Sequence, residues 1–196
     1  MAIIAGARTR RLPAEARRAE ILVAARSVFG SRGYHAATTR EIGAAAGVSE
    51  ALLYQHFASK QQLFEAVIEG CAGELERRLC TAVEGADPLG DALTTYFLFV
   101  EEEADLYRIF FRQALQDEPF QRLHRQYSKR LLELVLTCLG VAPGPRSEVL
   151  GHGVAGMVSE LALWWVEERR QTRAEIVEQA VSMARAMHAS EVSHGC

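Results

Sequence analysis

Residues 45–57 read AAGVSEALLYQHF, and this stretch decides the fold of the N-terminal region. Two helix-like pieces meet at Gly47-Val48-Ser49, and the second piece is only about two turns long. An isolated helix of fewer than about 12–15 residues is marginal in water, so other helices must hold this one in place. Two helices joined by a short glycine-containing turn form a helix-turn-helix, whose second helix can enter a DNA major groove.

Capping signals around this stretch place the neighbouring helices. Thr38 and Glu41 form a capping box that predicts a helix start, and Ser49 is expected to cap the short helix. Upstream, a helix is predicted to begin at Pro13 and to stop at Gly33.

Downstream, the chain offers a further helix start and two docking residues. Ser59 and Gln62 form a second capping box, which opens a long helix. Leu53 and Phe57 are expected to point inward and to dock the short helix on its neighbours.

The longer stretch at residues 33–67 reads GYHAATTREIGAAAGVSEALLYQHFASKQQLFEAV. It resembles the DNA-binding region of TetR-type (tetracycline-repressor-like) bacterial transcriptional regulators. The shared pattern is Gly-aromatic, Thr-x-x-x-Ile, Ala-Gly-Val-Ser, Leu-Tyr-x-His-Phe, and Ser-Lys with a Leu three residues later. Beyond this region the chain resembles the family only in its helix count and in the Trp-Trp pair of the penultimate helix.

The resemblance implies a set of DNA-contacting positions. Thr39 and Arg40 match residues that meet phosphate and a base edge, and an arginine fork fits the two acceptors of guanine. Tyr54 and His56 match positions that bind the phosphate backbone. Lys60 lies in the first turn of the next helix, where backbone N–H groups also attract an anion. The DNA-binding residues expected on this basis are Thr39, Arg40, Ser49, Glu50, Ala51, Leu52, Tyr54, His56 and Lys60.

Departures from the family pattern leave the operator sequence open. Glu50 stands where the family often has a basic or neutral residue, and its carboxylate could accept from a cytosine amine or oppose phosphates. Gly43 replaces the usual Ala, which weakens the helix slightly. Alternatives also remain open for three side chains: Tyr54 as a core aromatic, His56 as a surface histidine and Arg40 as a solvated charge.

Charge is distributed unevenly along the chain. The 196 residues have a net charge of −3, but residues 1–60 carry +5, from nine Lys/Arg and four acidic residues, and the remainder carries −8. A basic head on an acidic body is typical of a protein that meets a polyanion with one region. The basic arm with Arg8, Arg10 and Arg11 either reaches a minor groove or is a tail without a DNA role.

The composition predicts an all-α fold, because Ala and Leu are plentiful and Gly and Pro are sparse. We expect about nine helices, in an N-terminal three-helix helix-turn-helix domain and a C-terminal helical ligand-binding and dimerisation domain. The expected segments are a flexible basic arm at 1–13, a DNA-binding domain at 14–58, an effector-binding and dimerisation domain at 59–189, and a disordered tail at 190–196.

Targeting and cysteine signals point to the cytoplasm. The sequence has no run of 18 or more apolar residues, so a membrane-spanning helix is not expected. The N-terminus does not have the order of charged and apolar residues that a signal peptide needs. Cys71, Cys80, Cys138 and Cys196 are scattered and are expected to be free thiols, with a redox role left open. No cofactor and no metal are expected.

A helix-turn-helix usually reads a palindrome as a dimer, so two apolar stripes in the last helices are candidates for a homodimer interface. The alternative is that both stripes face the core of their own chain. The candidate interface residues are Val154, Met157, Val158, Leu161, Trp165, Ile176, Ala180, Val181 and Ala184.

The middle of the body is rich in aromatic residues, and in the family this region encloses an effector pocket. Such residues can equally form plain core. The candidate pocket combines apolar walls with a few polar groups, as small-molecule sites do. The candidate residues are Phe99, Glu103, Tyr107, Phe111, His124, Tyr127 and Trp164.

These observations predict a DNA-binding transcriptional regulator, most simply a repressor released from a palindromic DNA operator when a small, largely apolar effector binds. The alternative is a helical small-molecule carrier or an enzyme without DNA binding. We expect that the protein is not an enzyme. The sequence shows no nucleophile with a matched base, no P-loop and no dinucleotide-binding glycine pattern. A carrier would explain the aromatic body but not the basic head.

Overall fold

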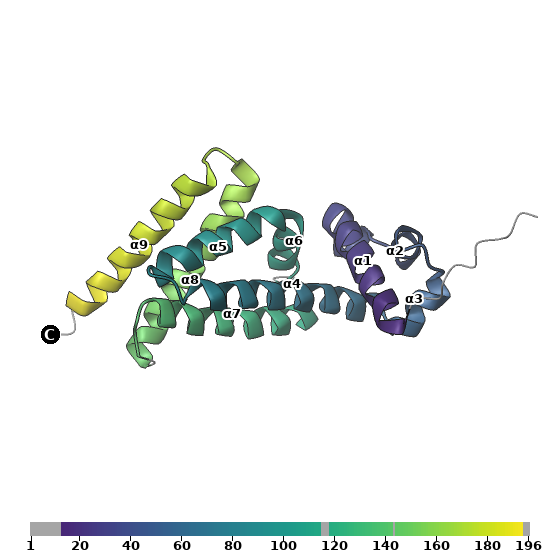
Figure 1. Cartoon of the computed structure of the whole chain (residues 1–196), viewed down its shortest axis with the longest axis horizontal. Coiled ribbons are helices and arrows are strands. Elements are labelled where there is room, and N and C mark those ends of the chain that lie inside the picture. The colour runs from purple at the N-terminus through teal and green to yellow at the C-terminus, as the bar shows by residue number, and fades with distance from the viewer. Residues whose placement is uncertain (1–12, 115–117, 143, 194–196) are drawn as a thin grey trace, which may run out of the picture. The chain divides into compact units, whose positions relative to one another are not determined.

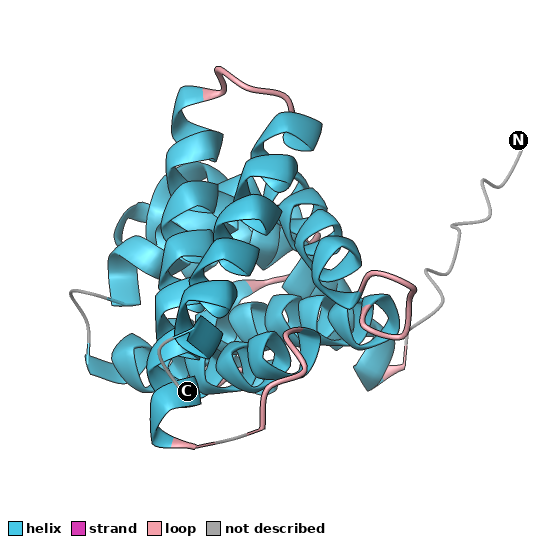
Figure 2. Cartoon of the chain, turned by 90° about the vertical axis from the view of Figure 1, so that its left-hand side faces the viewer, coloured by secondary structure: helices cyan, strands magenta, loops and turns pink. Residues whose placement is uncertain are grey.

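The computed structural model describes residues 13–114, 118–142 and 144–193, and every regular element within them is helical (Figures 1 and 2). The all-α prediction is confirmed. The nine helices of the described residues are α1 (Ala14–Ala36), α2 (Thr39–Ala45), α3 (Glu50–His56), α4 (Lys60–Ala82), α5 (Pro88–Glu102), α6 (Ala104–Ala114), α7 (Glu118–Cys138), α8 (Pro145–Glu168) and α9 (Arg173–Ser193).

The helices form two compact units, residues 1–67 and 68–196. The first unit extends beyond the expected boundary at residue 58, because Leu63, Phe64 and Val67 in the first turns of α4 are buried. The second unit begins at Ile68, so α4 is a continuous helix that belongs to both. The basic arm lies in residues 1–12, outside the described ones, whereas α9 continues to Ser193, into the segment expected to be a tail.

The core of the first unit is small and entirely apolar. Each of its helices contributes a fully buried side chain: Phe29 from α1, Ile42 from α2, Leu53 from α3 and Phe64 from α4. The rings of Phe29 and Phe64 meet edge to face with centroids 5.0 Å apart, a favoured aromatic geometry. Phe57, which follows α3, is also buried, so the predicted docking of the short helix is confirmed.

Local capping sets the helix boundaries of this unit. The Thr38 hydroxyl accepts from the Glu41 N–H, and the Glu41 carboxylate accepts from the Thr38 N–H, which completes the predicted capping box. The Ser49 hydroxyl accepts from the Leu52 N–H and caps α3 as predicted. The box at Ser59 is only half formed, because the side chain of Gln62 accepts from Ala58 instead of Ser59. Helical geometry breaks at Gly33, where φ is +77°.

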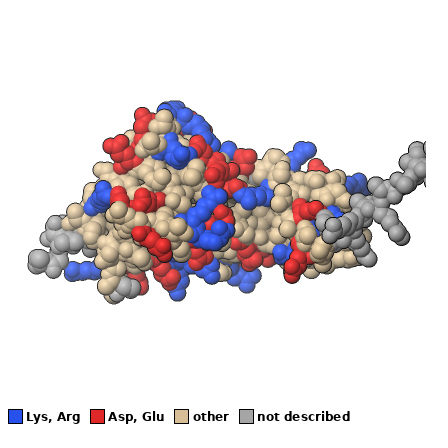
Figure 3. Space-filling view, viewed as in Figure 1, with Lys and Arg blue, Asp and Glu red and all other residues tan. Residues whose placement is uncertain are grey.

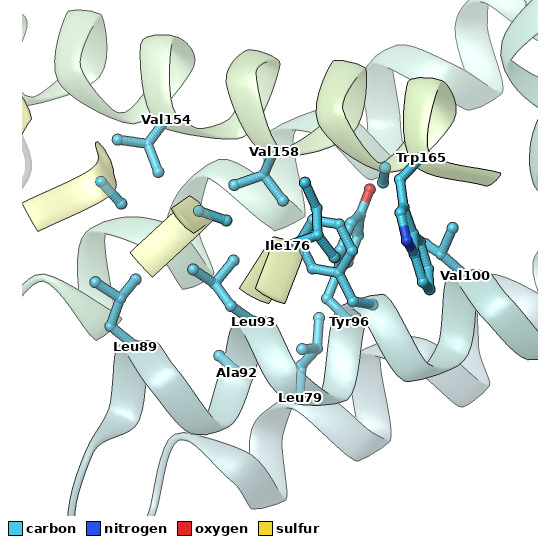
Figure 4. Close-up of a cluster of buried hydrophobic side chains, with 14 of the residues drawn as sticks. Leu79, Leu89, Ala92, Leu93, Tyr96, Val100, Val154, Val158, Trp165 and Ile176 are labelled. Carbon is cyan, nitrogen blue, oxygen red and sulfur yellow. The ribbon is translucent and has the colours of Figure 1, made fainter. Parts of the chain in front are cut away.

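The core of the second unit is larger and lies among α5, α8 and α9 (Figure 4). Side chains of α5, among them Leu93 and Tyr96, point toward Val158 of α8 and Ile176 of α9. Helix α5 packs along α9, and α7 packs along α8. Asp87 caps α5 through the Gly90 N–H, as its position before Pro88 predicts, and also pairs with Arg185 of α9.

A glycine allows α7 and α8 to approach each other closely. A Cβ atom placed on Gly151 would lie 2.2 Å from Cδ1 of Leu132 and 3.2 Å from Cδ2 of Leu136. A side chain at this position would therefore require Leu132 to change its conformation or the two helices to shift.

Helix α8 is also, among the described residues, the one helix long and apolar enough to cross a membrane by length and composition. Its apolar residues include Val154, Ala162 and Val166, which the chain itself buries. The visible face of the second unit mixes basic and acidic side chains (Figure 3). Ion pairs of this unit include that of Arg130 with Glu76.

Candidate functional sites: a helix-turn-helix and an apolar cavity

The turn between α2 and α3 is tight, and a glycine lies at each of two close points in it. Gly47 has a φ of +65°, the left-handed region that favours glycine. Gly43 is buried against the turn, where an added Cβ would lie 3.0 Å from the carbonyl oxygen of Val48. The N–H of Val48 donates to the carbonyl of Gly43 at 2.9 Å. Glycine at position 43 therefore relieves a close contact with the turn, and an alanine there would require a small shift of the Val48 carbonyl.

A chain of side-chain hydrogen bonds joins α2 to α3. The Thr39 hydroxyl donates to the Glu50 carboxylate, and the Tyr54 hydroxyl lies 3.3 Å from the same Thr39 oxygen. Because the Thr39 proton is committed to Glu50, Tyr54 is the donor in the second contact. Thr39 is accordingly buried, with 8% of its surface exposed, and its hydroxyl serves this chain instead of pointing outward.

The other predicted DNA-binding residues form an accessible polar surface. Arg40, Ser49, Glu50, Ala51 and Tyr54 are exposed, and Leu52 and His56 are half-buried. Tyr54 keeps 47% of its surface exposed although it follows the fully buried Leu53. The structure therefore does not support Tyr54 as a core aromatic.

Lys60 requires a correction. Its Nζ donates to the carbonyl oxygens of Tyr34, His35 and Ala37 at 2.9, 3.3 and 3.1 Å. It also lies over the Tyr34 ring, 4.7 Å from the centroid. An ammonium group has three N–H donors, and all three are used on carbonyls at the end of α1. We therefore remove Lys60 from the phosphate-binding set and assign it to holding α1 against α4.

The candidate dimer stripes require a second correction. Most of their residues are buried by their own chain, in the core of the second unit. They pack among α5, α8 and α9, so they have no surface left for a partner. The buried residues are Val154, Val158, Trp165, Ile176, Ala180 and Ala184. Met157, Leu161 and Val181 are half-buried beside them and remain candidates.

The two adjacent tryptophans were predicted to line the effector pocket (Trp164) and the dimer interface (Trp165), and the structure places them differently. Trp165 is 2% exposed, its ring lies 5.8 Å from that of Phe97, and its Nε1 donates to the Gln171 carbonyl at 2.9 Å. Trp164 is 41% exposed and does not line the cavity described next. Neighbouring residues of a helix point about 100° apart, so the two rings can have different surroundings.

An apolar cavity of about 80 Å³ lies among α4, α5, α6 and α7 of the second unit. Five of the seven predicted effector residues line it. Trp164 does not, and the side chain of Phe111 lies outside the described ones. The lining residues that were predicted are Phe99, Glu103, Tyr107, His124 and Tyr127.

Sequence reasoning missed the α4 wall of this cavity, which consists of Ile68, Cys71, Ala72 and Leu75. These residues follow each other at helical spacing, but the same spacing also fits plain core. Cys71, Cys80 and Cys138 are reduced thiols that are not joined in disulfides, as expected, and Cys196 lies outside the described residues.

Burial favours the neutral forms of two titratable side chains of the cavity, Tyr107 and His124. Burial raises the pKa of Tyr107 well above its usual value, and it lowers the pKa of His124. Nδ1 of His124 lies 3.4 Å from the Ser128 hydroxyl, and Arg125, its neighbour in sequence, is exposed outside the cavity. The site therefore offers hydrogen-bonding groups in an apolar setting, which suits a small apolar ligand with a polar end.

Comparison with known proteins finds family matches in both units of the chain. The family described as "Bacterial regulatory proteins, tetR family" matches residues 21–67, and the "Tetracyclin repressor-like, C-terminal domain" matches residues 86–187. The chain is 30% identical over 153 residues to the HTH-type transcriptional regulator BetI of Rhizobium meliloti, covering 74% of this chain and 75% of BetI. It is 39% identical over 116 residues to the HTH-type transcriptional activator FasR of Mycolicibacterium smegmatis, covering 57% of this chain and 53% of FasR.

Solved structures show the same architecture. A tetR-family transcriptional regulator from Streptomyces coelicolor has a TM-score of 0.83 and 26% identity, covering 93% of this chain and 85% of that one. A TetR-like transcriptional regulator from Rhodococcus sp. RHA1 has a TM-score of 0.75 and 26% identity, covering 89% and 96%.

Proposed function

Because the chain belongs to the TetR family of DNA-binding transcriptional regulators, we propose that it is a cytoplasmic repressor whose operator is released when a small, largely apolar effector occupies the α4–α7 cavity. The observation that carries the proposal is the pairing of two features in one chain. One is the exposed polar surface of the helix-turn-helix, and the other is an apolar cavity walled partly by α4, the helix that continues from that head.

The DNA contacts that we propose follow from exposure and chemistry. Arg40 is exposed on α2, where its guanidinium can reach a guanine edge. Tyr54 and His56, at the end of α3, can donate to phosphate oxygens. The Tyr54 hydroxyl contacts Thr39 at 3.3 Å, a long hydrogen bond that a phosphate oxygen can replace.

Release of DNA is proposed to act through α4. The helix begins in the head at Lys60, and its later residues Ile68, Cys71 and Leu75 form a wall of the cavity. A ligand that displaces this wall changes the orientation of the helix that carries the head. A coupling of about 1–3 kcal/mol between ligand and DNA is typical of allosteric proteins and corresponds to a 5- to 150-fold change in operator affinity.

A homodimer is the second part of the proposal, because a palindrome is read by two recognition helices. The buried stripes cannot supply its interface, so we assign it to the solvent face of α8 and α9. Val149 is 69% exposed, Trp164 41% and Met183 37%, which is unusual for large apolar side chains. Gly156 is exposed on the same helix as Val149 and Trp164, and a Cβ there would meet nothing within 4 Å.

The experiment is a gel-shift assay with DNA from the region upstream of the protein's own gene. We expect wild-type protein to shift this DNA, and the Arg40→Ala, Tyr54→Phe double variant to bind it at least tenfold more weakly, because a base contact and a phosphate contact are lost. Arg122→Ala, an exposed arginine of the second unit, is the matched control and should bind as wild type. Unchanged binding by the double variant would remove these residues from the DNA-binding surface.

A transcription assay decides the sign of regulation. Loss of the gene should raise expression from the shifted promoter if the protein is a repressor. Since FasR, one of the similar proteins, is an activator, a fall in expression is the result that would replace our proposal with activation.

A further inference from the structure

A second apolar cavity, of about 50 Å³, lies next to the first within the second unit. Tyr96 and Leu131 appear in the walls of both cavities, so these two side chains form the partition between them. Neither cavity reaches the roughly 300–1,000 Å³ that small-molecule pockets occupy. A ligand of ordinary size therefore requires the partition, or the helices around it, to move.

The two cavities differ in polarity. The second is walled by aliphatic side chains of α4, α5, α7 and α8, including Leu79, Leu89, Val135 and Val154. The first holds the polar groups, and Glu103 carries the only charge among the lining residues that the structure describes. From the first cavity to the second, the lining thus changes from polar and aromatic to mainly aliphatic, with Cys138 and Ser159 as the exceptions beyond the partition.

A short hydrogen-bonded chain holds the partition in place. The Tyr107 hydroxyl donates to the Ser159 carbonyl at 3.1 Å and accepts from the Tyr96 hydroxyl, whose oxygen lies 2.6 Å away. Tyr107 lines the first cavity and Ser159 the second, so this chain crosses from one to the other. Tyr96 is buried among α5, α8 and α9 (Figure 4), and one hydroxyl contact fixes its ring against Tyr107.

We propose that the two cavities are the two ends of one channel, opened by displacement of Tyr96 and Leu131, and that its ligand is a linear alkyl amine or alkyl ammonium ion. The tail lies in the aliphatic cavity and the head lies beside Glu103. This deepens the proposed function, on which it rests, by naming the chemical class of the effector.

The head group follows from the lining of the first cavity. The carboxylate of Glu103 favours a cationic head group. Burial lowers the pKa of the His124 ring and so disfavours a competing positive charge there. The face of Phe110 can add cation–π attraction. Phe99 and Tyr127 each already have a guanidinium group of this chain nearby, since Arg78 and Arg130 lie 5.7 and 5.9 Å from their ring centroids.

The test is calorimetric titration of the full chain with butyl-, hexyl-, octyl- and decyltrimethylammonium, each below its micelle concentration. Burial of one methylene strengthens binding about fourfold, so each step of two carbons should add about 15-fold along the whole series. Ala155→Phe, and separately Val135→Phe, fill the aliphatic cavity. In both variants the affinity should stop rising with tail length at a shorter tail than in wild type. Val23→Phe adds the same ring at an exposed valine of α1, outside both cavities, and should match wild type.

Three results would overturn the channel. They are a wild-type affinity that stops rising at hexyl, filled variants that still gain with tail length, and decyl sulfate binding as tightly as decyltrimethylammonium. The gel-shift assay separates this failure from failure of the proposed function. If some other apolar compound releases the DNA while tail length has no effect, the regulator stands and the channel does not.

Discussion

Replacing Lys60 by Met separates two roles that this residue could have. One is structural, through hydrogen bonds from its ammonium group to the end of α1, and the other is a contact to DNA. Met keeps the aliphatic stem and removes the ammonium that donates to Tyr34, His35 and Ala37. Hydrogen bonds from a charged donor contribute about 1.5–3 kcal/mol each when buried. Lys60 is only half-buried, and the exposed His35 carbonyl can bind water instead, so the full sum does not apply.

Counting about one such bond, with about 0.5–1 kcal/mol for the contact with the Tyr34 ring, gives a loss of roughly 2–4 kcal/mol. For a chain of this length, 1 kcal/mol corresponds to about 2–4 °C in Tm, so we expect a fall of about 4–16 °C by calorimetry. Lys129→Met is the matched control, because Lys129 is exposed on α7, and its Tm should not change.

The DNA measurement completes the test. A lysine bound to one phosphate contributes about 0.9 to the slope of log affinity against log salt. If Lys60 has the structural role, the Lys60→Met variant should keep the wild-type slope of log affinity against log salt at temperatures where the variant is folded. A slope lowered by about 0.9 with an unchanged Tm would refute the structural role and return Lys60 to the phosphate-binding set.

Three further outcomes follow from the second unit. Gly151→Ala should lower the free energy of unfolding by about 1–3 kcal/mol in denaturant titration, since its Cβ would overlap the α7 side chains; an unchanged midpoint would mean that the helices separate freely. Trp165→Ala should lower the free energy of unfolding by about 3–5 kcal/mol by the same method. Trp164→Ala should leave the stability of the monomer unchanged and weaken the dimer in sedimentation. Equal losses of stability in the two variants would contradict the different burial of the two rings. The Gly90 N–H, and then Arg185, lower the pKa of Asp87 in the folded chain. The unfolded chain therefore takes up the proton first, and the stabilisation is present above about pH 4 and disappears as the pH falls through the lower folded pKa. Asp87→Asn should flatten this acid side of the stability curve, and an unchanged curve would show that other carboxylates dominate.

Sequence reasoning was most successful where structure depends on neighbouring residues. The capping box at Thr38 and the cap at Ser49 need only residues two or three positions away, and both form as predicted. The docking of Leu53 likewise follows from the spacing of apolar residues within a few turns.

It was less successful where a side chain meets a partner far away in the chain. The carbonyls that bind Lys60 lie 23 to 26 residues upstream, beyond any local motif. The apolar stripe through Trp165 was found correctly, but α5 and α9 cover it, and a stripe does not record whether its own chain or a partner does so. The cavity residues were largely predicted because aromatic and polar groups recur there, while the α4 wall has no distinctive side chain.

The hydrogen bond between Thr39 and Glu50 has a consequence for how this regulator could acquire new targets. Position 50 opens the recognition helix, so altering it is the obvious route to a different operator preference. Here that residue also anchors the preceding helix, and exchange for a side chain that accepts no hydrogen bond leaves the buried Thr39 hydroxyl with only its long contact to Tyr54. Retargeting by directed evolution should therefore yield paired changes at positions 39 and 50 more often than single ones, a covariation readable by deep sequencing of selected libraries.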